Sequence, residues 1–200
     1  MIKNVIFDVG NVLVDFCWRE LMDDLKLPED LKGVFEGTVF GSHWWGELDR
    51  GVRDEDEILA MLREDNREHC REFDLIWSNR DKLVKPYDYT LEMIDALKER
   101  GLKIYLLSNY PKNLFTLHAE SGCFPFLDRV DGKVVSGFVK LVKPDREIYE
   151  YLLRKYDLRA EECVFLDDRA DNVEAARELG ITGILFEGYR QALGELERII

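Results

Sequence analysis

The chain has 200 residues, of which 46% are hydrophobic and 34% are charged. This length and balance are typical of a globular protein with one large core, or with one core and a smaller appended module. The formal net charge of −13 argues against a nucleic acid or an anionic membrane as the main partner, because both require a basic surface.

The cysteines and the N-terminal segment indicate a compartment. The cysteines are widely scattered and form no CxxC pair or Cys–His cluster, so we expect reduced thiols. They are Cys17, Cys70, Cys123 and Cys163. Asp8 and Asp15 interrupt the N-terminal apolar stretch, and no window has the roughly 18 apolar residues that a membrane span requires. We therefore expect a cytoplasmic protein.

Four short apolar runs are predicted to be buried strands. They are residues 5–7, 104–107, 164–166 and 184–186. Each run is continuously apolar rather than alternating, which is typical of parallel strands that are covered on both faces. Helical patterns lie between most of them, and two of these patterns end before Gly101 and Gly180, as helices often do. The alternation predicts an α/β fold with a doubly wound parallel sheet.

Residues 16–85 interrupt this rhythm with helical periodicity and no convincing strand. Pro86 disfavours helix at Lys85 and is typical of a linker. We therefore predict a Rossmann-like core of residues 1–15 and 87–200, with a small helical cap inserted at 16–86. Two linkers, near Asp15 and Pro86, would make this cap movable.

Polar residues follow three of the four predicted strands. Asp8 follows the first, Ser108 and Asn109 the second, and Asp167 and Asp168 the third. In open α/β sheets, ligands bind beyond the carboxyl ends of the strands, so these residues are predicted to form one site. Carboxylates that converge in a cleft repel one another unless a hard cation lies between them. Magnesium, which prefers a few carboxylates together with substrate phosphate, is the best candidate.

Lys143 is the candidate phosphate-binding cation. It precedes Pro144, which is predicted to open a helix of residues 144–156. A cation at the positive end of a helix dipole costs about 0.3–1 kcal/mol, which a binding role would explain. A solvated lysine offset by Asp145 and Glu147 is the alternative interpretation. Pro111 is likewise predicted to open a helix whose N–H groups point at an anion.

Four segments of the sequence, in order, resemble the motifs of the haloacid dehalogenase superfamily of aspartate-nucleophile phosphatases. They are FDVGNVLVD, LLSNYP, VKPD and VFLDDRADNVEAARELG. The resemblance covers nearly the whole chain, in the branch with a helical (class I) cap inserted after the first strand. It is strongest to bacterial sugar-phosphate phosphatases of the α-D-glucose-1-phosphate phosphatase kind, whose first motif also reads Asp-x-Gly-Asn.

The resemblance implies roles for individual residues. Asp8 would be the nucleophile that becomes an aspartyl phosphate, Ser108 would bind a phosphate oxygen, and Lys143 would neutralise developing charge. Asn109 would assist phosphate binding through its backbone or as a helix cap. The implied Mg²⁺ ligands are Asp168, Asp8, the Gly10 carbonyl and Asp167, the last directly or through water. Asn172 would support this loop, or have a structural role only.

Gly10 departs from the family pattern. Phosphatases of this family usually have a second Asp at this position as general acid and base, a role that contributes about 10²- to 10⁴-fold. Asp15 is not a convincing replacement, because many relatives have an Asp there as well as the usual pair. We therefore expect turnover to depend on a good leaving group, such as an anomeric hydroxyl, or on a water or substrate group that carries the proton.

The cap stretch GSHWWGELDRG is predicted to set specificity. His43, Trp44 and Trp45 are candidates for a sugar site, with packing inside the cap as the alternative for Trp45. We assign no catalytic or binding role to His69 and His118. The sequence thus predicts a magnesium-dependent phosphatase of a small phosphate ester, monomeric or weakly dimeric. Two alternatives are a 2-haloacid dehalogenase, which the Asp167–Asp168 pair disfavours, and a catalytically weak binding protein without its general acid.

Overall fold

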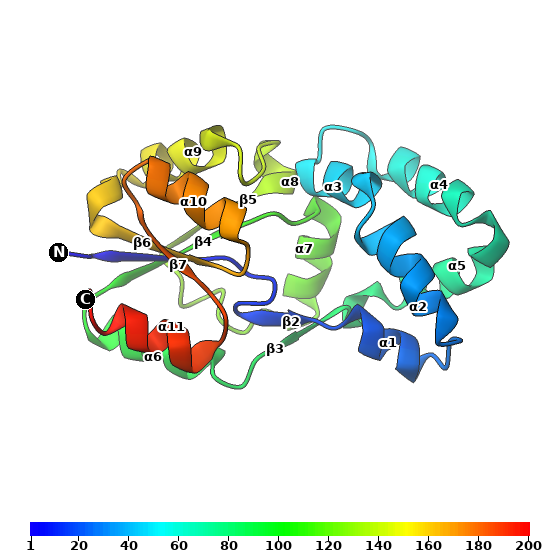
Figure 1. Cartoon of the computed structure of the whole chain (residues 1–200), viewed down its shortest axis with the longest axis horizontal. Coiled ribbons are helices and arrows are strands. Elements are labelled where there is room, and N and C mark those ends of the chain that lie inside the picture. Colours follow the sequence, from blue (N-terminus) through cyan, green and yellow to red (C-terminus); the bar gives the residue numbers. More distant parts are fainter.

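A five-stranded parallel sheet forms the centre of the larger lobe of the computed structural model, which describes residues 1–200 (Figure 1). The strands are β1 (Asn4–Phe7), β4 (Lys103–Ser108), β5 (Gly132–Val135), β6 (Cys163–Asp167) and β7 (Thr182–Leu185). Their order is β5-β4-β1-β6-β7. The predicted α/β fold with a parallel sheet is therefore confirmed.

Alternation along each strand divides the core into two layers. Val5 and Phe7 of β1 face α6 (Thr90–Glu99), α7 (Lys112–Glu120) and α11 (Tyr189–Leu196). Ile6 faces α9 (Arg146–Tyr156) and α10 (Ala170–Glu178) on the other side. All three side chains are fully buried, which explains why residues 5–7 of this strand are all apolar.

Three details differ from the sequence-based expectations. The edge strand β5 was not predicted, because only its last two residues are buried and apolar. The helix expected to open at Pro144 begins at Arg146, two residues later. β7 ends at Leu185, one residue before the predicted end. The glycines at 101 and 180 do follow helices in the left-handed region, at φ 82° and 84°.

A helical region forms the second lobe, on the right in Figure 1. Its helices are α1 (Trp18–Asp24), α2 (Asp30–Phe35), the π-helix η1 (Glu36–Phe40), α3 (His43–Arg50), α4 (Glu55–Asp65) and α5 (Cys70–Ser78). Short 3₁₀ turns η2 (Arg67–His69) and η3 (Arg80–Lys82) complete it. Its buried apolar residues form a separate cluster that extends from Trp18 to Leu83. A second core of its own is what an inserted module requires.

A two-stranded antiparallel ribbon joins the two lobes. β2 (Val14–Phe16) pairs with β3 (Val84–Pro86), so both predicted linkers are strands that bond to each other. The sequence predicted no strand here because each is only three residues long. The remaining core elements are α8 (Ser136–Val139) and the 3₁₀ turn η4 (Ala160–Glu162). None of the helices is long and apolar enough to cross a membrane.

We expect Leu62→Ala to destabilise the helical lobe strongly. Leu62 of α4 is fully buried in the cluster of this lobe, and a cavity of this kind costs about 2–5 kcal/mol. The adjacent Met61 is 46% exposed, so Met61→Ala should stay within about 0.5 kcal/mol of the wild type. Urea unfolding of the two variants measures the difference. Equal stabilities would contradict the packing described here.

Candidate active site

The buried ammonium group of Lys143 lies between two carboxylates at the carboxyl edge of the sheet. Its Nζ is 2.9 Å from Oδ1 of Asp8, just after β1, and 2.6 Å from Oδ2 of Asp167, the last residue of β6. All three side chains are buried. Since adjacent parallel strands end at the same edge, residues about 160 positions apart in the chain meet at one lysine.

Burial and charge act in opposite directions on Asp8. Removal from water raises the pKa of this carboxyl, the Lys143 ammonium lowers it, and Asp167 and Asp168 raise it again, to a result of about 7. At Lys143, burial lowers the pKa, but Asp8 and Asp167 outweigh it and the pKa rises. The lysine therefore stays charged, as a cation held between two acids should.

Asp167 is a fully bonded carboxylate rather than an open ligand. Besides Lys143, it accepts hydrogen bonds from the Asn172 side chain at 2.9 and 3.1 Å and from the Arg169 backbone at 2.9 Å. It is fully buried and does not line the cavity described below. This geometry suits a group that orients Lys143 better than one that reaches a metal. Asn172, in the first turn of α10, holds Asp167 in place.

A cluster of oxygen ligands suited to a hard cation is present. Asp8, Asp167 and Asp168 have carboxylate oxygens within 4.8 Å of one another, and Gly10 lies in the loop beside Asp8. Burial raises the pKa of Asp168, while Asn11, whose Nδ2 donates to Oδ2 of Asp168 at 3.0 Å, lowers it. Several carboxylates with few counter-charges match the donor preference of Mg²⁺.

Asn109 and Ser108 have different environments at the end of β4. Asn109 clamps the backbone of Lys143 with two hydrogen bonds of 2.8 Å, one donated by its Nδ2 and one accepted by its Oδ1. Its side chain therefore positions Lys143 rather than capping α7, whose N-cap is Pro111. The Ser108 hydroxyl is buried and has no partner in the chain, so it retains capacity for a ligand oxygen.

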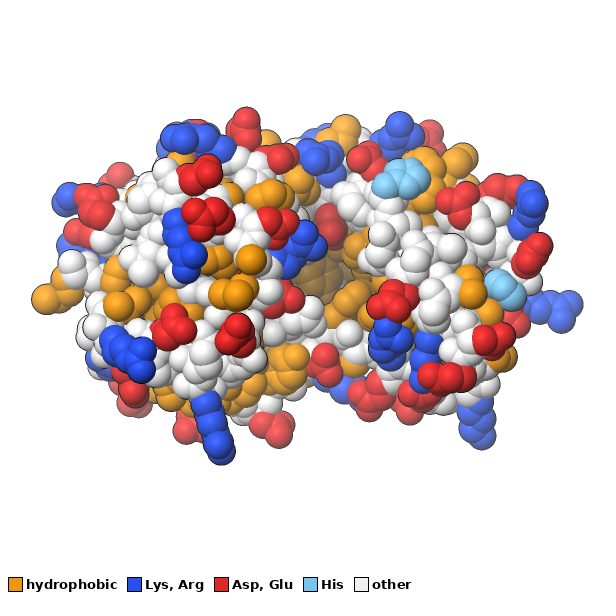
Figure 2. Space-filling view, viewed as in Figure 1, with side chains coloured by type: hydrophobic (Ala, Val, Ile, Leu, Met, Phe, Trp, Pro, Cys, Tyr) orange, Lys and Arg blue, Asp and Glu red, His pale blue; other side chains and the backbone are white.

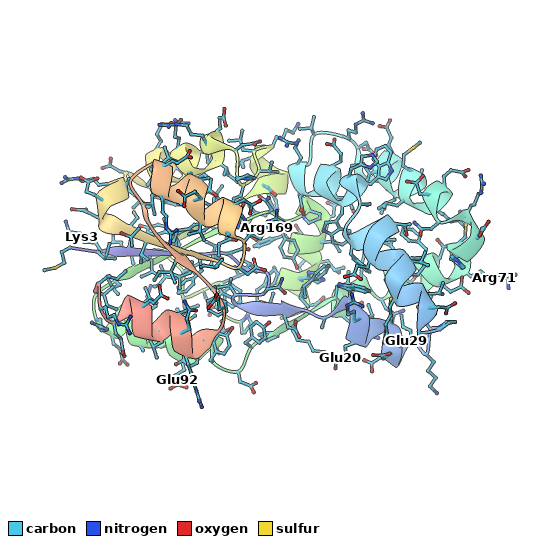
Figure 3. All side chains as sticks on the ribbon, viewed as in Figure 1. Lys3, Glu20, Glu29, Arg71, Glu92 and Arg169 are labelled. Atoms are coloured by element: carbon cyan, nitrogen blue, oxygen red, sulfur yellow. The ribbon has the colours of Figure 1, made fainter.

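A cavity of about 580 Å³ lies between the two lobes, and Figure 2 shows its mouth as the central hollow. Asp8, Gly10, Asn11, Lys143 and Asp168 line it from the core. Phe16, Trp18, Phe40, Trp45 and Asp49 line it from the ribbon and the helical lobe. Figure 3 places Arg169 beside this gap and Lys3 at the opposite end of the sheet. The volume is within the usual range for small-molecule sites.

Two of the predicted substrate-binding residues lie elsewhere. Trp44 donates from Nε1 to Asp65 at 2.8 Å, and His43 packs against Trp44 with ring centroids 4.1 Å apart. Neither lines the cavity, because Trp44 points toward the end of α4 and His43 is exposed beside it. Trp45 and Asp49, which are one helical turn apart, line the cavity instead.

Sequence reasoning missed roles for Asn11 and Asp49. Asn11 has φ 56° and holds Asp168, and an asparagine after a glycine beyond a strand is a recognisable signal for such a left-handed position. Asp49 follows Trp45 by one helical turn, a spacing that places both on one face. Which face of α3 meets the core is decided by packing between the lobes, and a helical pattern alone does not determine it.

A scan against protein families matches residues 2–180 to the haloacid dehalogenase-like hydrolases. The match spans most of the chain and includes every residue of the site. The chain therefore belongs to this family and is a hydrolase. The narrower resemblance to α-D-glucose-1-phosphate phosphatases stays a prediction.

Individual relatives agree with this assignment. The sesquiterpene phosphatase astK of Aspergillus oryzae is 28% identical over 202 residues, which cover 99% of this chain and 96% of that protein. The glyceraldehyde 3-phosphate phosphatase of Methanocaldococcus jannaschii is 26% identical, with coverage of 90% and 83%. A haloacid dehalogenase family enzyme of Bacteroides thetaiotaomicron, bt-2542, solved as a magnesium complex, has a TM-score of 0.69 at 22% identity, with coverage of 96% and 98%.

We expect Lys143→Met to destabilise the metal-free protein by about 3 kcal/mol, because removing one partner of a buried ion pair leaves uncompensated charge. Lys85→Met is the matched control, since it breaks an exposed pair with Glu20 of 2.6 Å whose loss should cost under about 1 kcal/mol. Unfolding in urea with EDTA measures both. A smaller loss for Lys143→Met than for Lys85→Met would contradict the role of Lys143 described here.

Proposed function

We propose that this protein is a magnesium-dependent phosphatase that hydrolyses a small-molecule phosphate monoester through an aspartyl-phosphate intermediate. The observation that carries the proposal is the Lys143 ammonium between Asp8 and Asp167 at the floor of the cavity, with Asp168 alongside. Phosphoryl transfer needs a nucleophile in line with the leaving group and fixed positive charge around the phosphoryl oxygens. Asp8 would supply the nucleophile, and Lys143 would supply the positive charge.

Asp8 is suited to act as the nucleophile. Its Oδ1 accepts hydrogen bonds from the Val9 backbone at 2.7 Å and from Lys143. These bonds fix the orientation of the carboxylate, while Oδ2 has no hydrogen-bond partner in the chain. Ser108, with its unpartnered hydroxyl, would bind a phosphoryl oxygen, and Lys143 would stabilise the charge that develops there.

Asp8, Asp168 and the backbone carbonyl of Gly10 would hold the metal ion, and all three residues line the cavity. Mg²⁺, when bound, supplies positive charge to the phosphate and lowers the repulsion between the phosphate and Asp8. Asn11 orients Asp168 through its 3.0 Å hydrogen bond. Asp167 would act behind these ligands, through Lys143, because its oxygens are already bonded.

Residues 16–86 would form the cap that encloses the substrate. A sugar phosphate is the first candidate, because Trp45 offers an aromatic face and Asp49 a polar group on the cavity wall. The narrower expectation of an α-D-glucose 1-phosphate type of substrate belongs to this candidate.

A phosphate ester with an apolar organic group is the second candidate substrate. Four aromatic rings line the cap side of the cavity, namely Phe16, Trp18, Phe40 and Trp45. Phe40 contacts each of the other three, with ring centroids 4.7–5.6 Å apart. A continuous aromatic wall favours an apolar leaving group. Rates for sugar phosphates compared with isoprenoid phosphates would separate the two candidates.

We expect Asp8→Asn to abolish phosphate release, because an amide neither attacks phosphorus nor carries the charge that binds the metal. Phosphate release is measured for p-nitrophenyl phosphate and a panel of sugar phosphates, in Mg²⁺ and in EDTA. Asp88→Asn is the control, since it changes an exposed aspartate in the turn after β3. Release in EDTA equal to that in Mg²⁺, or persistent activity of Asp8→Asn, would refute the mechanism. No release from any ester, with turnover of a 2-haloacid, would establish the dehalogenase alternative.

We expect Asp168→Asn to raise the Mg²⁺ concentration needed for half-maximal activity by at least tenfold, because it removes one of the two open carboxylates of the proposed site. Asp171→Asn serves as the control in the first turn of α10, three residues later, since Asp171 pairs with Arg169 at 2.7 Å and is not part of the acidic cluster. Magnesium titrations of phosphate release compare the two variants. Equal half-saturation for Asp168→Asn and the wild type would show that Asp168 is not a ligand.

A further inference from the structure

The proposed reaction requires a proton donor that the core does not supply. When an ester bond breaks, the leaving oxygen needs a proton unless it is a stable anion, and the attacking water must later lose one. Gly10 has no side chain at the position where this family usually has an aspartate. The inference below rests on the proposed phosphatase function and assigns these proton transfers to a side chain of the other lobe.

We propose that Asp49 of α3 is the general acid and base of this enzyme. Asp49 lines the same cavity as Asp8 and Lys143, from the opposite wall. Its carboxylate makes no hydrogen bond and no ion pair within the chain. A carboxyl group placed across a substrate cavity from the nucleophile is on the side where the leaving group departs, since attack and departure are in line.

Two other proton-carrying side chains that line the cavity, Glu36 of the helical lobe and His118 of α7, are engaged elsewhere. Glu36 pairs with Arg19 at 2.6 Å. His118 uses both ring nitrogens, with Nδ1 2.6 Å from the hydroxyl of Tyr110 and Nε2 2.7 Å from the carbonyl of Arg80. These bonds leave Asp49 as the acid without a partner.

The backbone of Asp49 is attached to the core although the residue belongs to the helical lobe. The hydroxyl of Ser136, in α8, donates to the carbonyl of Asp49 at 2.5 Å. Gly51, which ends α3 at φ 65°, lies so close to Gly137 that an added Cβ would be 2.6 Å from the Gly137 carbonyl oxygen. Arg50 also pairs with Asp145 at 3.3 Å. Asp49 therefore keeps a defined position relative to Asp8.

The electrostatics agree with this assignment. Burial and the nearby charge of Asp8 raise the pKa of Asp49 to about 7, and Lys143 lowers it only in part. An acid–base catalyst works best when its pKa is close to the working pH. The two charged groups that shift the pKa of Asp49, Asp8 and Lys143, both belong to the core.

The proposed reaction has two steps. In the first, a carboxylate oxygen of Asp8 bonds to phosphorus, the bond between phosphorus and the ester oxygen breaks, and protonated Asp49 gives its proton to that oxygen. In the second, the Asp49 carboxylate takes a proton from water while the water oxygen bonds to phosphorus. The bond between phosphorus and Asp8 breaks, and inorganic phosphate leaves. Asp8 is again a carboxylate and Asp49 again an acid.

Asp49→Asn tests the inference with two esters of similar shape, phenyl phosphate and p-nitrophenyl phosphate. Phenolate is a poor leaving group, since a phenol has a pKa of about 10, whereas p-nitrophenolate leaves without a proton. We expect kcat/KM for phenyl phosphate to fall roughly 100-fold or more and that for p-nitrophenyl phosphate to fall less than about tenfold. We also expect a burst of p-nitrophenol equal to the enzyme concentration, because the second step still lacks its base.

Two further variants separate proton transfer from structural effects. Glu47→Gln removes a carboxylate from the same helix, outside the cavity, and should leave both rates unchanged. An added Cβ at Gly10 meets no atom within 4 Å, so the backbone has room for a side chain to start there, and Gly10→Asp adds a carboxylate beside Asp8. When Gly10→Asp is added to Asp49→Asn, kcat/KM for phenyl phosphate should rise at least tenfold above that of Asp49→Asn alone.

The outcomes distinguish this inference from the proposed function. If Asp49→Asn lowers kcat/KM equally for both esters, or for neither, Asp49 is not the acid and base. The phosphatase function would still be supported if the wild type releases phosphate and Asp8→Asn does not. A wild type that releases no phosphate from either ester in Mg²⁺ would overturn the proposed function itself. If Asp49→Asn slows phenyl phosphate much more than p-nitrophenyl phosphate and Gly10→Asp restores the rate, then Asp49 is the acid. The prediction that turnover depends on a good leaving group would then be wrong.

Discussion

The site depends on one buried lysine that neutralises two buried carboxylates. An unpaired charge in a protein interior costs several kcal/mol, so Asp8, Lys143 and Asp167 are stable there only together. Asn109 fixes the lysine backbone and Asn172 fixes Asp167. This support confines the cation to one position, which leaves one oxygen of Asp8 without a partner at the cavity floor. The ammonium group of Lys143 thus has a fixed orientation within the protein alone.

The division of the chain into two lobes gives one cavity two different walls. The core contributes carboxylates and the lysine, whereas the helical lobe contributes the aromatic wall around Phe40 and Trp45 and the carboxylate of Asp49. The short β2–β3 ribbon joins the lobes, and a bond from Ser136 attaches the end of α3 to the core. The helical lobe is therefore held to the core at two separate places, and the second of these positions Asp49.

The sequence predicted the sheet well because each central strand is an apolar run that ends in a polar residue. It predicted the convergence of Asp8, Asp167 and Asp168 for the same reason, since parallel strands end at one edge. It did not predict β5, whose edge position requires little apolar sequence. It did not show that Trp45 and Asp49, rather than His43 and Trp44, line the cavity, because helical periodicity shows which residues share a face but not which element that face contacts.

The sequence by itself determined the fold class, the family and the acidic cluster at the ends of the central strands, because these follow from local patterns and from motifs. Only the tertiary structure decided what each of them touches. Asp167 became a support for Lys143 because Asn172 and Arg169 occupy its oxygens. Asp49 entered the cavity because α3 packs against α8. Hydrogen-bond partners and facing surfaces come from segments far apart in the chain, so no local pattern encodes them.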